Sequence, residues 1–263
     1  MLVFLFGFNF ISTFPTNEST PYRIIICCFF LILAINCFFI KALKKYWKVS
    51  FAFFLASLGM LLNWVIRDLP FRFLYDDIKI TEGLWMLDKL SQLIAIALPI
   101  ILLTIILRQG LSSLYICRGN GRLWLIIGLS TFIIFTAAGI TVSVINSGWN
   151  KTLMVLPWLF AFSVFNGFME ELWFRGLFLK KFEPFIGMHL SILVTSLIFS
   201  IPHIFARYIS GMGISLGFFA LVFSLGMASG YIIYKTKSIW GAVLFHIGYD
   251  LFYALAIGFT AVK

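Results

Sequence analysis

The sequence predicts an all-α, polytopic membrane protein, a helix bundle of about eight or nine transmembrane helices. Of its 263 residues, 62% are hydrophobic and 11% are charged, and the mean hydropathy is +1.03, a composition that soluble domains do not have. The apolar runs are long and lack the apolar/polar alternation of a membrane β-barrel. Helices are therefore expected, because a helix satisfies its own backbone hydrogen bonds in lipid.

The apolar runs define the candidate membrane spans, of which the first is short for a bilayer that needs about twenty residues. The first fourteen residues lack a basic region and an A-x-A-like cleavage site, so we expect a retained segment and not a removed signal peptide. The expected spans are 2–14, 22–40, 49–66, 85–107, 123–145, 153–179, 189–206, 213–234 and 239–261.

Charges between the spans predict the topology. Basic residues gather at 41–48, 108–122, 180–181 and 235–237, and such connections are typically cytoplasmic. The charge-balanced segment 67–83 and the poorly charged joins at 147–151 and 207–213 are expected on the outside. The amino terminus lies inside if 2–14 spans the membrane, and outside if that segment rests in the interface.

The net charge of +10 does not indicate nucleic acid as a partner, because the basic residues form short clusters between apolar runs. The four cysteines lack the spacing of a disulfide framework or a zinc site, and we interpret them as packing residues. Membrane lipids are the expected surroundings. Richness in Phe, Ile and Lys is typical of AT-rich genomes and favours a bacterial cytoplasmic membrane. No pattern indicates an oligomeric state.

We expect one membrane domain with two functional parts. The sequence has no internal repeat, no low-complexity tract and no long linker. Polar residues deep in the spans gather after Trp124, whereas the earlier spans contain mainly Phe, Leu and Ile. Residues 1–122 are therefore predicted to be amino-terminal scaffold helices, and residues 123–263 the working part.

The most informative stretch is 166–179, where Glu170, Glu171 and Arg175 interrupt an apolar run. A charge in hydrocarbon costs from about 2.5 to more than 10 kcal/mol, so such charges are kept when they are paired, hydrated or used. On a helix, residues four apart share a face, which predicts that Glu171 and Arg175 pair. Glu170 turns roughly 100° away and stays free to act as a general base.

Two later spans carry histidines. In the first, His203 lies four residues after Phe199 and directly after Pro202, a proline that we expect to bend the helix and open a polar pocket. In the last, His246 and Asp250 are four residues apart and share a face. Phe199 is interpreted as packing around the site.

Depth in the membrane supports a common site. A rise of 1.5 Å per residue places Glu170, His203 and His246 roughly 12 to 20 Å from the cytoplasmic side. Groups in the same layer of the bilayer can meet, so we expect the three side chains to form one site.

These segments, EELWFR, FSIPH and HIGYD, resemble the three motifs of the CAAX protease and bacteriocin-processing (CPBP, or Abi) family of intramembrane proteases. The family patterns are Glu-Glu-x-x-x-Arg, Phe-x-x-x-His and His-x-x-x-Asn/Asp, and here they occur in the same order. The resemblance covers 124–259. It implies that 123–263 form a CPBP-type catalytic membrane core and that the protein is an intramembrane endopeptidase.

The resemblance also implies roles for individual residues. Glu170 and His203 would activate a water that hydrolyses a peptide bond, and His246 would bind the developing oxyanion. Glu171 and Arg175 would hold the geometry of the pocket. The eukaryotic branch of the family cuts prenylated carboxy-terminal peptides, whereas small peptides or other membrane proteins are the substrates expected in bacteria.

Asp250 departs from the commoner family pattern, in which an Asn stands at this position. An amide donates a hydrogen bond that an ionised carboxylate cannot donate. Asp250 would have to be protonated to assist with the oxyanion. Alternatively, it accepts from His246 and fixes the tautomer of that ring, leaving His246 as the donor; we prefer this second role.

The sequence allows two expectations for the cofactor, a catalytic zinc or none. The family is often described as metalloproteases, and Glu170, His203 and His246 would be the three ligands of a catalytic zinc. The zinc-protease motif H-E-x-x-H is absent. We expect a metal-free mechanism, with zinc as the alternative.

Two functions other than proteolysis fit parts of the pattern. A non-catalytic immunity or scaffold protein that binds a peptide or a membrane partner would have the same fold. An ion- or proton-coupled transporter would also need acids and histidines at mid-membrane. The two halves of the sequence contain no matching pair of broken helices, which argues against transport.

Overall fold

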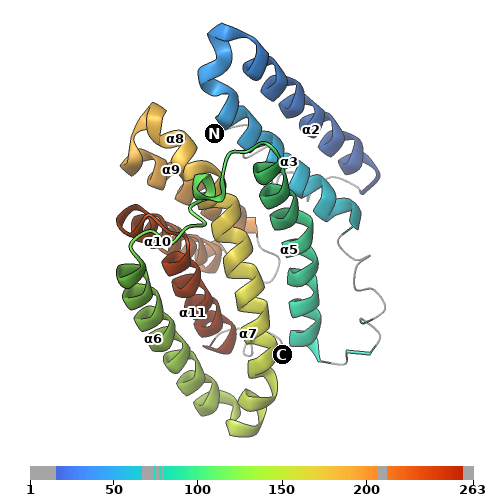
Figure 1. The fold of residues 1–263 in the computed structure, drawn as a ribbon. Coiled ribbons are helices and arrows are strands. Elements are labelled where there is room, and N and C mark those ends of the chain that lie inside the picture. The colour runs from blue at the N-terminus through green and yellow to red at the C-terminus, as the bar shows by residue number, and fades with distance from the viewer. Residues whose placement is uncertain (1–15, 67–73, 75–76, 79, 206–211, 257–263) are drawn as a thin grey trace.

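The computed structural model describes residues 16–66, 74, 77–78, 80–205 and 212–256. These residues form a bundle of α-helices, and none of them lies in a β-strand (Figure 1). The all-α fold is therefore confirmed. The expected first span, 2–14, lies outside the described residues.

Helices run through nearly the whole described chain, joined by short turns. 3₁₀ turns occupy Lys41–Tyr46, Leu111–Leu114 and Ile201–Phe205, and a π-helical turn, Glu171–Gly176, joins α7 to α8. In chain order the α-helices are α2 (Thr16–Phe39), α3 (Trp47–Ile66), α5 (Thr81–Ile106), α6 (Gly121–Ser147), α7 (Trp149–Glu170), α8 (Leu177–Ile186), α9 (Met188–Ser200), α10 (Met212–Thr236) and α11 (Trp240–Ala256).

Among the described residues, six helices are long and apolar enough to cross a membrane. The shorter apolar helix Met188–His203 begins one residue before the expected span 189–206 and otherwise lies within it. Helix α11, which falls within 239–261, has 17 residues up to Ala256. The protein is thus a polytopic helical membrane bundle. The six long helices are Thr20–Phe39, Lys41–Val65, Thr81–Ile106, Gly121–Ser147, Trp149–Ile186 and Leu216–Thr236.

Local sequence explains where several helices begin and end. The side chain of Asn120 caps α6 by accepting a hydrogen bond from the backbone N–H of Leu123 at 3.1 Å. Gly187, with φ of +74°, separates α8 from α9, because L side chains rarely adopt that backbone conformation. The α-helical part of α9 ends at Ser200, two residues before Pro202, and continues as a 3₁₀ turn. We expected the proline to bend this helix, and in the structure α9 ends just before it.

Three of the four basic segments of the sequence are joined by hydrogen bonds. The backbone N–H of Asn120 donates to the carbonyl of Thr236 at 2.7 Å, and Nζ of Lys180 donates to the carbonyl of Ser112 at 3.1 Å. These hydrogen bonds join three basic segments that the charge pattern assigns to the cytoplasmic side. Residues 180–181, expected as a connection between spans, lie within α8, because the helix continues to Ile186. The assignment to that side of the membrane remains a prediction.

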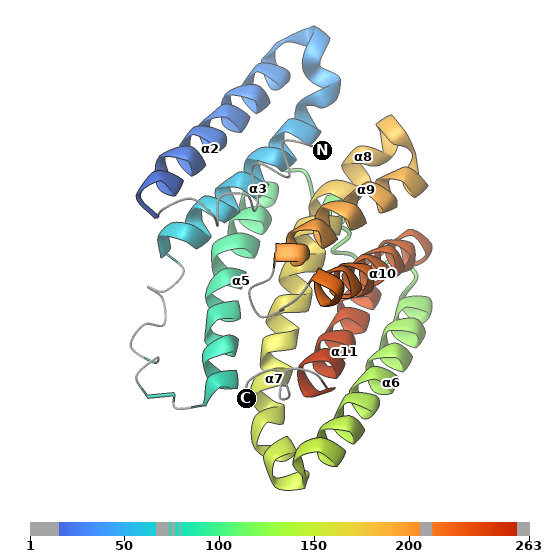
Figure 2. The ribbon, with the colours of Figure 1, turned by 180° about the vertical axis from the view of Figure 1, so that it is seen from behind.

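Close packing of α6 against α11 fixes the helix that carries His246. A Cβ atom at Gly248 would lie 2.7 Å from Cα of Phe132, and one at Gly139 would lie 2.8 Å from Cα of Phe252. Glycine lets two helix backbones approach closely in lipid, where packing and not water drives association. Helix α11 lies beside α6 and α7 in both views (Figures 1 and 2).

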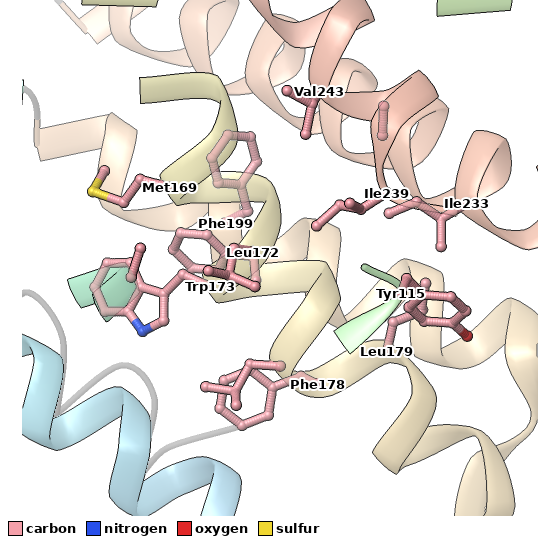
Figure 3. Close-up of a cluster of buried hydrophobic side chains, with 14 of the residues drawn as sticks. Tyr115, Met169, Leu172, Trp173, Phe178, Leu179, Phe199, Ile233, Ile239 and Val243 are labelled. Carbon is pink, nitrogen blue, oxygen red and sulfur yellow. The ribbon is translucent and has the colours of Figure 1, made fainter. Parts of the chain in front are cut away.

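An apolar core surrounds the π-helical turn that joins α7 to α8 (Figure 3). Leu172 and Phe199 are 0% and 1% exposed, and the ring of Phe174 lies 5.1 Å from that of Phe199 in an edge-on arrangement. The charged side chains of this turn are consequently held among apolar and aromatic neighbours.

Candidate active site

Polar side chains from five parts of the bundle converge where α7 passes into the π-helical turn. The turn supplies charged groups from within the apolar core, and the adjacent helices supply the rest. The side chains are Lys89 of α5, Asn166 and Glu170 of α7, Glu171 and Arg175 of the π-helical turn, His203 of the turn after α9, and His246 and Asp250 of α11.

Glu171 and Arg175 form a buried ion pair, as their four-residue spacing predicts. Nη1 of Arg175 donates to Oε1 of Glu171 at 3.1 Å, and both side chains are 0% exposed. An ion pair without water stabilises a structure only if further polar contacts satisfy its charges. The structure supplies one such contact on the same carboxylate oxygen.

That contact is His246, whose Nδ1 lies 2.8 Å from Oε1 of Glu171. A carboxylate paired with arginine only accepts hydrogen bonds, so Nδ1 of His246 carries a proton and donates it. Glu171 thereby fixes the ring's orientation and leaves Nε2 facing the opposite way. The sequence interpretation had preferred Asp250 for this tautomer-fixing contact, whereas the structure places Glu171 on Nδ1.

The free nitrogen of His246 faces two other carboxylates. Nε2 lies 3.5 Å from Oε2 of Glu170 and 3.5 Å from Oδ1 of Asp250. The imidazole, itself 1% exposed, therefore separates the buried Glu171 from two carboxylates that are 14% and 16% exposed. One side of the site is closed in protein, and the other retains access.

Lys89 approaches Glu170 from α5. Its Nζ lies 4.0 Å from Oε1 of Glu170, and its side chain is 21% exposed. The same ammonium donates to Oε1 of Gln92 at 3.3 Å, which restrains it toward the site. A cation thus faces the carboxylate that is the predicted general base.

Asn166 completes the contacts of Asp250. Its Nδ2 donates to Oδ2 of Asp250 at 2.9 Å, and its Oδ1 is buried without a hydrogen-bond partner among the described residues. Asn166 lies four residues before Glu170, on the same face of α7. An amide from α7 therefore lies beside the carboxylate of Asp250.

His203 is oriented by the end of α9. Its Nδ1 lies 2.9 Å from the carbonyl oxygen of Phe199, one of the last four carbonyls of α9, which have no partner within the helix. Because a carbonyl only accepts, Nδ1 is the donor, and Nε2 is left as an acceptor in the neutral ring. Glu170, Lys89 and His246 are all close enough to act electrostatically on this imidazole.

Phe199 lies between the histidines and the buried arginine. Its ring centroid is 5.2 Å from that of His203 and 5.9 Å from that of His246. The guanidinium carbon of Arg175 lies 4.3 Å from the same ring, in range for a cation–π contact. On α10, a Cβ at Gly226 would come within 2.6 Å of Nη2 of Arg175, so glycine makes the room that the guanidinium occupies.

No group of three His, Cys, Asp or Glu side chains within 16–66, 74, 77–78, 80–205 and 212–256 is arranged to hold a metal ion. The metal-free mechanism and the zinc alternative, with Glu170, His203 and His246 as ligands, both stay predictions. The mechanism proposed below uses no metal.

Sequence reasoning missed Lys89 and Asn166. Lys89 belongs to the part that was assigned to the scaffold. The available signal was its charge, which lies about 12 Å along α5 from Thr81, within an apolar helix. Asn166 could have been found from its four-residue spacing to Glu170. The division into 1–122 and 123–263 remains a prediction, with α5 contributing to the site.

Residues 152–252 match a protein family described as type II CAAX prenyl endopeptidase, Rce1-like. This segment contains all three motifs, and the match confirms, for 152–252, the resemblance to CAAX proteases that those motifs indicated. Comparisons with curated proteins and with solved structures gave no match.

Proposed function

We propose that the protein is an intramembrane endopeptidase that hydrolyses a peptide bond of a membrane-associated peptide or protein. One observation carries the proposal: within the Rce1-like segment, the accessible carboxylate of Glu170 faces Nε2 of His246, whose Nδ1 is tied to the buried Glu171–Arg175 pair. A general base beside a fixed hydrogen-bond donor is what hydrolysis by water requires.

The general base is Glu170. Its carboxylate takes a proton from a water that also donates to Nε2 of His203, the acceptor nitrogen of that ring. The resulting hydroxide adds to the carbonyl carbon of the substrate. When the tetrahedral intermediate collapses, the C–N bond breaks, and Glu170 passes its proton to the departing amine.

His246 stabilises the oxyanion. Its Nδ1 proton is committed to Glu171, so a donor at Nε2 makes the ring an imidazolium. The carboxylates of Glu170, Glu171 and Asp250 surround that ring and offset its charge. The proton on Nε2 then faces the accessible side of the site, where the substrate carbonyl binds.

Asn166 and Lys89 position the reacting groups. Asn166 holds Asp250 beside Nε2 of His246 through its 2.9 Å hydrogen bond. Lys89 faces Glu170 from α5 and offsets the negative charge of its carboxylate.

Hydrolysis of membrane-tethered peptides by purified protein tests the proposal. The panel contains prenylated carboxy-terminal peptides and unmodified single-span peptides, and the reaction is run in water enriched in ¹⁸O. We expect a cleavage product whose new carboxyl group carries ¹⁸O, and no effect of a strong zinc chelator. Binding of a peptide without cleavage would favour the immunity or scaffold function, and loss of cleavage with chelator would favour zinc.

A further inference from the structure

Lys181, on α8, is a buried cation outside the candidate active site. Its side chain is 6% exposed, and Nζ is buried without a hydrogen-bond partner among the described residues. No ion pair within the described part of the chain involves it. An unpaired ammonium removed from water is costly, which makes its position informative.

The charges that act on Lys181 add to this cost. Lys180, its neighbour on α8, and Lys48, at the start of α3, both act electrostatically on its ammonium group. Both of these lysines are exposed. Glu183, the carboxylate of the same helix, acts on Tyr115. Three lysines therefore gather where α3 and α8 meet, and we refer to Lys48, Lys180 and Lys181 as the lysine cluster.

Packing holds the ammonium of Lys181 in place. Phe178 and Phe182, which flank Lys181 on α8, both contact Phe53 of α3, with ring centroids 5.2 and 6.3 Å apart. A lysine at a membrane surface usually extends its amine to water. Nζ of Lys181 is instead buried, so its amine does not reach water in this way.

The surroundings of the cluster match those of a lipid headgroup. Beside it, Tyr46 of the turn before α3 stacks on Phe185 of α8 at 5.5 Å, and both rings are exposed, at 40% and 45%. Ile186, at the end of α8, is also exposed. Lys180 donates to the carbonyl of Ser112, which joins the cluster to the basic segment 108–122.

We propose that the lysine cluster binds the phosphate of an anionic phospholipid, with Lys181 as the innermost ligand and the exposed Phe185 and Ile186 against its acyl chains. A phosphate supplies the acceptor oxygens that the buried ammonium lacks. Basic groups at a membrane surface attract anionic lipids. This site is separate from the peptidase proposal and does not depend on it.

Lipid retention by the purified full chain tests this site. The protein is exchanged into mixed micelles of phosphatidylglycerol and phosphatidylcholine, and the bound lipid is counted by native mass spectrometry. We expect the wild type to retain phosphatidylglycerol and Lys181→Met to lose affinity for it by about fivefold or more, since one lysine near a membrane surface contributes about 1 kcal/mol.

Two further variants separate binding from folding. Lys48→Gln changes an exposed member of the cluster and is expected to weaken phosphatidylglycerol retention in a folded protein, whereas Lys41→Gln, an exposed lysine outside the cluster, is expected to leave it unchanged. Equal retention by the wild type, Lys181→Met and Lys48→Gln would overturn the proposal. So would retention of inorganic phosphate without any preference for phosphatidylglycerol over phosphatidylcholine.

Discussion

The amide of Asn166 on α7 donates to the carboxylate of Asp250 on α11 over 2.9 Å. This hydrogen bond links the first and third motif segments, because Glu170 follows Asn166 by one helical turn and His246 precedes Asp250 by one turn. The carboxylate that departs from the commoner family pattern therefore has an amide partner from another helix.

Exchanging the two groups tests whether this pair positions the site. Asn166→Asp places two carboxylates opposite each other and should lower kcat by about tenfold to a hundredfold, the effect of losing a hydrogen bond of about 1.5–3 kcal/mol to a charged group. The double variant Asn166→Asp/Asp250→Asn restores one amide and one carboxylate and should recover much of the rate. Equal rates in the single and double variants would show that the contact has no role in catalysis.

The buried pair of Glu171 and Arg175 should determine stability. Arg175→Met leaves the carboxylate of Glu171 without its cation and should lower the free energy of unfolding by about 3–5 kcal/mol. Thermal unfolding in detergent measures the change, with the exposed Arg122→Met as the matched control. The double variant Glu171→Gln/Arg175→Met should lose less stability than the sum of the single losses. An unfolding temperature of Arg175→Met equal to that of the wild type contradicts this account.

Lys89 should act on catalysis through Glu170. Lys89→Met removes the cation 4.0 Å from Oε1 of Glu170 and should lower kcat about fivefold, the effect of about 1 kcal/mol for a partly exposed pair. KM should change little, because the interaction is with the base and not with the substrate. Lys89→Arg keeps the charge and should restore much of kcat. A fall in kcat that arginine does not rescue would indicate a packing role instead.

Glycine at the contact of α6 with α11 should be required for stability. Gly248→Ala places a Cβ 2.7 Å from Cα of Phe132 and should cost about 1–3 kcal/mol, as overpacking does elsewhere. Gly217→Ala on α10 is the matched control, because a Cβ there meets nothing within 4 Å and alanine favours a helix by about 1 kcal/mol. Thermal unfolding should rank the control at or above the wild type and Gly248→Ala below it. The reverse order would contradict the close approach of the helices.

The sequence was sufficient for the fold class and for much of the site. Uninterrupted apolar runs can form only helices in lipid, so the bundle follows from composition and length. The four-residue spacing of Glu171 and Arg175 was enough to predict their ion pair. The depth estimate placed Glu170 and His246 in one layer, and the structure brings Oε2 and Nε2 of these residues to 3.5 Å.

The partners of individual polar atoms could not be predicted in the same way. Spacing along one helix cannot show which nitrogen of His246 faces Glu171, because this depends on the rotation of α11 against the π-helical turn. For the same reason, Asp250 was expected to fix the ring that Glu171 orients. Lys89 was missed because its contact with Glu170 depends on the packing of α5 against α7, which no local pattern encodes.

The central claim is that Glu170 activates water, and the most direct measurement is the rate of peptide hydrolysis by Glu170→Gln. The control is Glu183→Gln, the same chemical change on α8, away from the site. We predict that Glu170→Gln folds, binds the peptide and loses at least about a hundredfold in kcat, as expected for removal of a general base, while Glu183→Gln cleaves like the wild type. Wild-type kcat in folded Glu170→Gln would contradict the mechanism.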